Sequence, residues 1–479
     1  MKYVVNGYEP EKLFRFFEDI SAIPRGSGNE KGIADYLENF AKDRGLEYFR
    51  DEYNSILIKK PATKGYEKKD TVLLQGHTDM VCEKNSDCDH DFEKDGLELY
   101  IENGRLRAKG TTLGSDDGIA VAAMLCALDS DIAHPDLECL FTVGEETGLI
   151  GANNFDYSKL KAKRLINLDS ESEGEAITGC AGGIEMIFSL KPERLPLPDI
   201  YRPLEFKISG LAGGHSGDDI IKERGNAIKL MWRLLSRIYE STPFSIVTIS
   251  GGSRSNAIPR ESRAVIFTSE PEAALEIAKN TEKMIKSELP EEDRDFKLSC
   301  GKAKGYSDKM LSLADTDRLL SIIGLMPCGV ISRIPTMPDM VQTSNSLGIL
   351  RDDSETIELF SHGRSSVDSN MDDLAENAKS LAKLTGAGLR IESRYSGWSP
   401  VYGSPLQKDF MKVASAIYDS PCLKTIHAGL ECGIIVSAMP GLDAISIGPD
   451  AQDIHTPNES LGLESAERFW KLIEGLLKI

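Results

Sequence analysis

From the N-terminus to about Gly183, the hydrophobic positions follow two different periods. Apolar residues recur at helical spacing over residues 13–20 and 33–40. Short apolar runs rich in strand formers lie at 71–75 (TVLLQ), 137–143 (LECLFTV) and 164–168 (RLINL). The Ala-rich segment 118–128 between the first two runs predicts a buried helix. Alternating strands and helices predict an α/β fold of three layers with a mostly parallel sheet.

The pattern changes after a proline-rich segment at residues 191–203, which predicts a linker. The order then becomes strand, helix, two strands, helix and strand, up to about Lys302. A comparable order recurs between about Asp315 and Arg394, and Ser-Asn pairs at 255–256 and 344–345 favour an internal duplication only weakly.

From about Gly397 the α/β pattern returns. We expect a helix over 407–417, a strand over 444–447 and a final helix from Ser465. The simplest organisation is one α/β domain, residues 1–187 and 397–479, interrupted by an inserted α+β domain, residues 188–396.

Composition and charge narrow the class of partner. The chain has 479 residues and a formal charge of −20, from 56 Lys and Arg against 76 Asp and Glu. This balance argues against nucleic acids and anionic membranes, which require a basic face. No apolar run approaches the ~20 residues of a membrane span, and the first residues lack a secretory core. The nine cysteines form no CxxC pair, so we expect reduced thiols and a cytoplasmic location.

Acidic residues and histidines follow the predicted strands. They occur in GHTD (76–79), GEE (144–146), NLD (167–169) and DIHTP (453–457), and SDDG (115–118) precedes the Ala-rich helix. Ligands of open α/β sheets bind at the carboxyl ends of the strands, so one shared site is expected there. Each cluster alone has an ordinary explanation, as a solvated loop, a surface pair or a helix cap; their coincidence at successive strand ends does not.

Imidazole and carboxylate donors together suit zinc, manganese or cobalt. The candidate ligands are His77, Asp116, Glu146, Asp169 and His455. They suffice for two ions about 3.5–4 Å apart that share one carboxylate. Asp79 is placed to orient the His77 ring, and Glu145 precedes a ligand and can serve as general base.

These motifs together resemble the co-catalytic dizinc peptidases, which include aminoacylases, glutamate carboxypeptidases and cytosolic dipeptidases. TTLGSDDGI, FTVGEETGL, GGHSGDDI, HAGLECG and HTPNE are most similar to the aminoacyl-histidine dipeptidase branch. The resemblance implies that His77 and Asp169 bind one ion, that Glu146 and His455 bind the other, and that Asp116 bridges them. The sequence here reads Asp-Asp-Gly where Asp-Lys-Gly or Asp-Asn-Gly is common, so Asp117 stays an alternative bridge.

The resemblance also extends to the insert, which would be a lid that carries dimer contacts in many relatives. His215 would donate to the oxyanion, Arg364 would grip the substrate carboxylate, and Asn256 and His427 would contact substrate, with Glu431 beside His427. From the residues alone, each can equally be a turn or surface residue. His90 and His134 are expected to be plain surface residues.

The implied activity is hydrolysis of unblocked dipeptides, preferentially Xaa-His including the β-Ala-His type. A water between two divalent ions, zinc in the first place, would attack the carbonyl, with Glu145 as general base. The alternatives are a deacylase or carboxypeptidase of the same family, a non-catalytic metal-binding relative and a phosphoesterase. The last lacks a glycine-rich phosphate cradle. The expected partner is a small peptide, and a homodimer is a further expectation.

Overall fold

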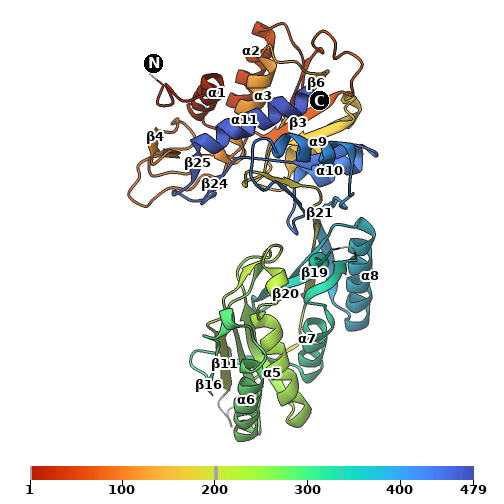
Figure 1. Cartoon of the computed structure of the whole chain (residues 1–479). Coiled ribbons are helices and arrows are strands. Elements are labelled where there is room, and N and C mark those ends of the chain that lie inside the picture. Colours follow the sequence, from red (N-terminus) through yellow and green to blue (C-terminus); the bar gives the residue numbers. More distant parts are fainter. Residues whose placement is uncertain (1–2, 199–202, 336) are drawn as a thin grey trace. The chain divides into compact units, whose positions relative to one another are not determined.

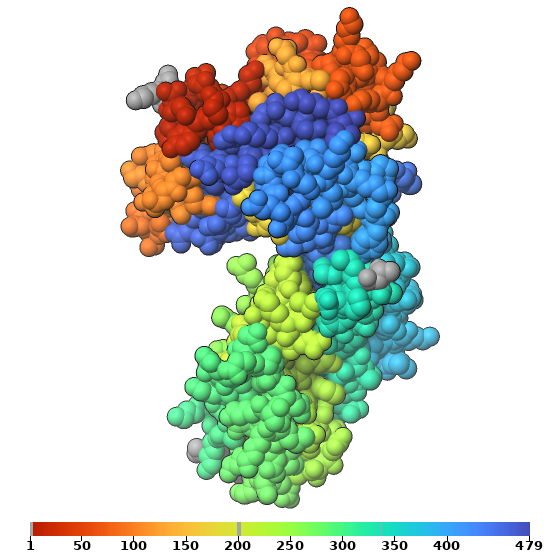
Figure 2. Space-filling view, in the orientation of Figure 1, coloured from red at the N-terminus to blue at the C-terminus, as the bar shows by residue number. Residues whose placement is uncertain are grey.

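The computed structural model describes residues 3–198, 203–335 and 337–479, which form two compact units (Figure 1). The sandwich unit comprises the chain up to Cys180, Trp398–Thr425 and Leu430–Ile479. The insert unit comprises Ala181–Gly397 and Ile426–Gly429. In the space-filling view, the red and orange N-terminal segments and the blue C-terminal segments pack into one body, so both ends of the chain build the sandwich unit (Figure 2).

The sandwich unit is built on an eight-stranded sheet in the order β1-β2-β6-β3-β7-β23-β8-β22. The four central strands, β6, β3, β7 and β23, run parallel to one another. The strands are β1 (Glu47–Arg50), β2 (Ile56–Lys60), β3 (Val72–His77), β6 (Leu137–Thr142), β7 (Arg164–Asn167), β8 (Glu175–Ile177), β22 (Cys422–Lys424) and β23 (Asp443–Ser446). Every residue of β3 and of β6 is buried, which explains their continuous apolar character.

Helices cover this sheet. They are α1 (Glu11–Ser21), α2 (Lys31–Asp43), α3 (Ser115–Leu128), α4 (Ile150–Asn154), α9 (Pro405–Ala414), α10 (Glu431–Ala438) and α11 (Leu463–Lys478). Residues of α1, α2, α3, α9 and α11 share one core with alternate residues of the strands, such as Leu74 and Phe141. Leu73 and Leu140, which face the other side, are also fully buried. A sheet buried on both faces is the predicted three-layer α/β fold.

Helix α3 shows how the sequence determines this packing. All its residues except Asp116 are buried, as expected for a helix that is apolar all round. Asp116 has extended backbone angles, φ −81° and ψ 104°, so the regular helix follows Asp117 as predicted. A small antiparallel sheet, β24-β25-β5-β4, completes the unit with β4 (Leu99–Glu102), β5 (Arg105–Ala108), β24 (Ala451–Gln452) and β25 (Ser460–Gly462).

The insert unit holds a nine-stranded antiparallel sheet, β16-β11-β15-β13-β19-β20-β9-β21, with β18 also paired to β19. Its strands are β9 (Gly182–Leu190), β11 (Leu204–Ser209), β13 (Phe244–Gly251), β15 (Ser262–Thr268), β16 (Lys297–Lys302), β18 (Gly329–Ile334), β19 (Met337–Asp352), β20 (Ile357–Ser365) and β21 (Gly388–Tyr395). Helices α5 (Ala227–Ser241), α6 (Pro271–Lys286), α7 (Leu313–Leu325) and α8 (Asp368–Thr385) share a core with the sheet. Short pairs are formed by β10 (Arg194–Pro196) with β17 (Lys309–Leu311) and β12 (Gly214–His215) with β14 (Ala257–Ile258).

The predicted order of elements in the insert, and the predicted α/β elements on either side of it, are present. The predicted first boundary, after residue 187, falls inside β9. This strand belongs to the insert unit because it pairs along its whole length with β20, from Gly182–Ser365 to Leu190–Ile357. The predicted linker 191–203 contains β10, and its residues 199–202 lie outside the described part of the chain. The domain ranges and the internal duplication stay predictions.

Two further observations concern the whole chain. All nine cysteines lie in the described part of the chain, and none of them forms a disulfide bond. Within the described residues, no helix combines the length and the apolar character needed to cross a membrane.

Candidate functional site

Three of the four parallel central strands deliver the predicted site residues to one edge of the sheet. His77 is the last residue of β3, Glu145 and Glu146 follow β6, and Asp169 follows β7. His455 comes from the loop between β24 and β25, where it adopts a left-handed backbone with φ 60°. This conformation is uncommon for a residue other than glycine, and such positions concentrate at functional sites.

Asp116 lies between the two histidines. Its Oδ1 is 2.9 Å from His77 Nε2, and its Oδ2 is 3.0 Å from His455 Nε2. Asp117 faces another way, because its Oδ2 accepts a hydrogen bond from the main-chain N–H of His77 at 3.2 Å. Of the two aspartates, Asp116 is therefore the one whose oxygens reach both imidazoles.

The remaining carboxylates complete two adjoining groups of donors. His455 Nε2 is 3.0 Å from Glu146 Oε1, and His77 Nε2 is 3.8 Å from Asp169 Oδ1. Asp116 with Glu146 and His455, and Asp116 with His77 and Asp169, each bring ligand atoms within 4.8 Å of one another. Glu145 forms a third such group with His77 and Glu146. Oxygen and imidazole donors in two sets that share one carboxylate are the chemistry of a two-ion site, so these residues fit a pair of divalent cations.

Asp79 is fully buried behind His77. Its carboxylate lies 3.4 Å from His77 Nδ1, and it accepts hydrogen bonds from the hydroxyl of Ser27 (2.8 Å) and the main-chain N–H groups of Glu145 (3.1 Å) and Glu146 (3.3 Å). One carboxylate thus contacts an imidazole and the backbone of the two glutamates. The main-chain carbonyl of Asp79 lies closer still to His77 Nδ1, at 3.1 Å, so the backbone and the carboxylate of one residue both face the ring. Contacts of this kind set the ring orientation of a metal-binding histidine.

The pKa values of the site residues are raised at some positions and lowered at others. The pKa of His455 is raised to about 10 by its contacts with Asp116 and Glu146. The pKa of Asp116 is lowered: burial opposes the shift, but the hydrogen bonds from His455 and His77 outweigh it. Burial raises the pKa of Glu145 to about 8 and that of Asp169 well above its ordinary value, and neighbouring carboxylates add to both shifts. Crowded, buried carboxylates are an environment that a cation would stabilise.

The insert unit carries a second cluster of predicted residues. Arg364, in β20, is only 4% exposed; its Nη2 lies 3.4 Å from His215 Nε2, and its Nη1 donates to the hydroxyl of Tyr395 at 3.3 Å. His215 Nδ1 lies 3.1 Å from Asp218 Oδ2. Among the described residues, no carboxylate oxygen comes within 4.0 Å of the Arg364 guanidinium, and its Nε has no hydrogen-bond partner. A buried guanidinium with no carboxylate in direct contact is suited to an anionic ligand.

Other histidines of the insert unit flank Arg364. His427 Nε2 is 2.7 Å from the hydroxyl of Ser344, and burial followed by the charge of Arg364 lowers its pKa to about 3. No motif of the sequence predicts a role for His362. Burial, then Arg364 and His215, lower its pKa to about 3, and neither ring nitrogen has a hydrogen-bond partner. Asn256 is exposed; its main-chain carbonyl accepts from Ser216, next to His215.

One prediction about the other histidines is wrong. His134 is 0% exposed rather than a surface residue, because its main chain pairs with Thr63 as the chain enters β6. His90 is half-buried, with its ring edge-on to Phe92 at 4.6 Å between centroids.

Sequence reasoning also missed the buried side chains that surround the site. Arg25 and Glu459 are each 2% exposed and hydrogen-bond the backbone of the loops that hold the candidate ligands. Glu459 lies in the HTPNE motif, but its spacing from His455 gave no sign of its contacts. Arg25 stands in no motif. The resemblance did single out Glu431, beside His427. This carboxylate is fully buried in the sandwich unit, where it accepts hydrogen bonds from Gln75 and Thr142 under the strand ends.

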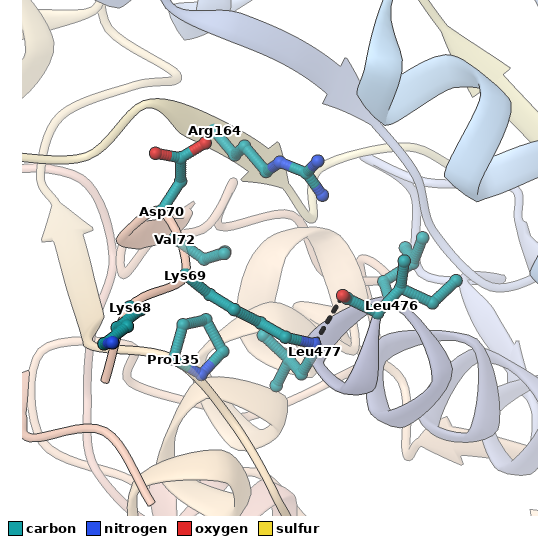
Figure 3. Close-up of a pocket in the computed structure, with 9 residues that line it drawn as sticks. Lys68, Lys69, Asp70, Val72, Pro135, Arg164, Leu476 and Leu477 are labelled. Atoms are coloured by element: carbon teal, nitrogen blue, oxygen red, sulfur yellow. Dashed lines mark hydrogen bonds between the residues drawn. The ribbon is translucent and has the colours of Figure 1, made fainter. Parts of the chain in front are cut away.

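A separate pocket of about 230 Å³ lies at the opposite ends of the strands, where β3 and β7 begin (Figure 3). Lys68, Lys69, Asp70 and Arg164 contribute its polar lining, and the Lys69 ammonium reaches the main-chain carbonyls of Lys478 and Ile479. Its lining includes none of the predicted site residues.

Comparisons with known proteins identify relatives of this chain. Residues 73–478 match the model of peptidase family M20/M25/M40. The cytosol non-specific dipeptidase of Escherichia coli K12 is 36% identical over 474 residues, which is 98% of this chain and 97% of that protein. The crystal structure of aminoacylhistidine dipeptidase from Vibrio alginolyticus superposes with a TM-score of 0.92 at 34% identity, over 100% of this chain and 98% of that one.

A more distant solved structure shares the fold. The aminopeptidase PepT of Bacillus cereus matches with a TM-score of 0.57 at 18% identity, over 98% of both chains. The family match covers most of the chain, and the relative from Escherichia coli is matched over nearly its whole length. The chain therefore belongs to peptidase family M20/M25/M40.

Proposed function

We propose that this protein is a dimetal dipeptidase that hydrolyses unblocked dipeptides and prefers Xaa-His substrates, including β-Ala-His. The observation that carries the proposal is the position of Asp116, with one oxygen on the imidazole of each histidine. The names of two relatives, a non-specific dipeptidase and an aminoacylhistidine dipeptidase, support the substrate class. A cytoplasmic location and a homodimer are part of the same proposal.

The candidate ligands divide into two sets. His77 and Asp169 would hold one divalent ion, Glu146 and His455 would hold the other, and Asp116 would contact both. Zinc fits this nitrogen and oxygen donor set, and manganese and cobalt fit it as well. When bound, such ions polarise a carbonyl group and lower the pKa of water.

The side chains of the chain itself supply the remaining chemistry. A Glu145 carboxylate oxygen takes a proton from the attacking water and delivers it to the nitrogen of the leaving amine. Its position beside the ligands is determined by Asp79, which binds its main-chain N–H. Asp79 also orients the ring of His77.

The cluster in the insert unit would recognise the substrate. Arg364 presents a forked set of donors that matches a carboxylate, which a dipeptide carries at its C-terminus. His215 would donate to the oxygen that becomes negatively charged during attack. Asn256 and His427 would add contacts to the peptide. These assignments are supported by the burial of Arg364 without a carboxylate partner and by its contact with His215.

The test is hydrolysis of a panel containing β-Ala-His, Gly-His, Leu-Leu and an N-acetyl amino acid. Metal-stripped protein is assayed with and without Zn²⁺, next to Glu145→Gln. The control is Glu67→Gln, at an exposed glutamate that precedes β3, at the opposite end of this strand from His77. We expect zinc-dependent cleavage of the unblocked Xaa-His dipeptides, retained by Glu67→Gln. Removing the proton carrier should lower kcat by about 10²–10⁴-fold in Glu145→Gln.

Other outcomes would redirect the proposal. Cleavage of the N-acetyl substrate alone would make the protein a deacylase with the same site. Binding of two equivalents of metal without turnover of any substrate would refute the dipeptidase function and favour a non-catalytic relative.

A further inference from the structure

The loop at residues 113–116 is held from two sides by buried charged side chains. This loop leads into helix α3, and Asp116 is the last residue of the loop. Because Asp116 has extended backbone angles, regular helical hydrogen bonding does not determine its position. Something else must satisfy the main-chain groups of the loop.

Glu459 satisfies the N–H groups. Its Oε2 accepts from the main-chain N–H of Leu113 at 2.8 Å and of Gly114 at 3.0 Å. Its Oε1 accepts from the N–H and the hydroxyl of Ser115, at 2.7 and 2.6 Å, and from the N–H of Asp116 at 3.5 Å. Glu459 follows His455 by four residues, so one buried carboxylate joins the His455 loop to the Asp116 loop.

Arg25 donates hydrogen bonds to main-chain carbonyl groups. Its Nη2 donates to the carbonyl of Gly114 at 2.5 Å, and its Nη1 donates to the carbonyls of Thr78 at 3.0 Å and Asp79 at 3.3 Å. The last two carbonyls follow His77 directly. The guanidinium therefore joins the His77 loop to the Asp116 loop.

The two glycines of the LGSDDG motif are explained by the same guanidinium. A Cβ at Gly114 or at Gly118 would lie 2.6 Å from Arg25 Nη2, so only glycine leaves room for it at either position. Gly114 also has a left-handed backbone, with φ 63°. The motif is thus shaped to receive Arg25 as well as to present Asp116.

We propose that Arg25 and Glu459 are positioning residues which together determine the relative placement of the three loops that carry His77, Asp116 and His455. Arg25 joins the first loop to the second, and Glu459 joins the second to the third. The inference rests on the metal centre of the proposed function. Its consequence is that either side chain controls metal affinity without contacting a metal ion.

The experiment measures metal binding rather than catalysis. Zn²⁺ affinity is determined by competition with a chromophoric chelator, and the visible spectrum is recorded with Co²⁺, for wild type, Glu459→Gln and Arg25→Lys. Glutamine keeps the shape of the Glu459 side chain, but its NH2 group would face main-chain N–H groups and cannot accept a hydrogen bond from them. Lysine keeps the charge of Arg25 but cannot reach carbonyls of both loops. Losses of this kind around metal ligands typically weaken binding by about 10–100-fold.

Matched controls lie at the other end of the sheet. Glu138 is 3% exposed and accepts from the main-chain N–H groups of Lys161 and Ala162, so Glu138→Gln removes comparable hydrogen bonds. Arg164, which pairs with Asp409, gives the control Arg164→Lys. The controls should lose unfolding free energy but keep the Zn²⁺ affinity and Co²⁺ spectrum of wild type. We expect Glu459→Gln and Arg25→Lys to weaken Zn²⁺ binding at least tenfold and to change the Co²⁺ spectrum.

Affinities and spectra equal to those of the controls would overturn the proposal. Where Glu459→Gln yields no folded protein, Arg25→Lys against Arg164→Lys decides alone. Failure of the wild type itself to bind two equivalents of metal would overturn the metal centre and this inference together, whereas inactive wild type that binds metal would leave this inference standing.

Discussion

Five acids near one edge of the sheet have pKa values that are shifted in different directions. They are Asp79, Asp116, Asp117, Glu145 and Asp169. Histidine contacts lower the pKa of Asp79 and Asp116, although burial opposes the shift. Burial raises the pKa of Asp117, Asp169 and Glu145, because the charge of His77 offsets the effect of burial only in part. Position, not residue type, decides the direction in which the pKa of each carboxylate moves.

Arg364 provides a prediction at this scale. Replacement by lysine keeps the charge but removes the fork of donors, so KM for Gly-His should rise and kcat/KM should fall about 10–100-fold. The measurement compares Gly-His with Gly-His amide, which lacks the carboxylate and should be unaffected by the change. Arg390→Lys, at an exposed arginine paired with Glu358 and Glu392, is the control. An equal loss on both substrates would refute carboxylate binding by Arg364.

His362 provides a prediction about pH. Its pKa is about 3 in the folded protein, against about 6.5 in an unfolded chain. Between these values the unfolded state binds a proton that the folded state does not, so stability falls as pH falls, by about 1.4 kcal/mol per pH unit. His362→Phe should remove this dependence without losing a hydrogen bond, since neither ring nitrogen has a partner.

Hydrogen exchange of the β20 amides between pH 6.5 and pH 4 measures the effect of His362 in the insert unit. The protection of wild type should decline more steeply with acid than that of His362→Phe. Parallel pH profiles for the two proteins would show that burial of His362 has no energetic consequence.

At the scale of elements, tight turns determine how strands of the insert sheet pair. Gly252 follows β13 with φ 67°, and a Cβ there would overlap the carbonyl oxygen of Gly348 in β19. Beside this glycine, β13 and β19 pair at Gly251 and Leu350. Within the described part of the chain this is the one pairing between the two strands, and it depends on the absence of a side chain at Gly252.

Gly252→Ala should destabilise the insert unit by about 1–3 kcal/mol, because the alanine is strained in backbone and overlaps a neighbour. Urea unfolding measures the loss. Gly301→Ala in β16, where a Cβ would meet nothing within 4 Å, is the control and should change stability little. Equal midpoints for the two variants would contradict this account of the turn.

At the scale of the whole molecule, the candidate ligands all belong to the sandwich unit. Ions that bind the folded state stabilise it by mass action, by about 4 kcal/mol when free metal is one thousand times Kd. Chelation should therefore raise hydrogen exchange in β3, β6 and α3 and leave α5–α8 of the insert unit unchanged. The insert helices are an internal control, and an equal rise in both units would contradict a site confined to the sandwich unit.

The sequence by itself determined the elements and the edge of the sheet where the chemistry lies. Helices such as α3 and strands such as β3 follow from local periodicity, because burial selects apolar residues at fixed spacings. Site residues at the ends of β3, β6 and β7 share one edge because parallel strands end together. The family resemblance rested on these residues together with the LGSDDG, GGHSGDDI, HAGLECG and HTPNE motifs.

Only the tertiary structure decided which side chains meet. Whether Asp116 or Asp117 faces the histidines depends on the backbone angles of one loop, and that loop is held by Arg25 and Glu459 from distant parts of the chain. Likewise, β9 joins the insert sheet because β20 pairs with it. Periodicity reports the neighbours of a residue along the chain, whereas the contacts of buried charged groups are set by segments that the fold brings together from far apart.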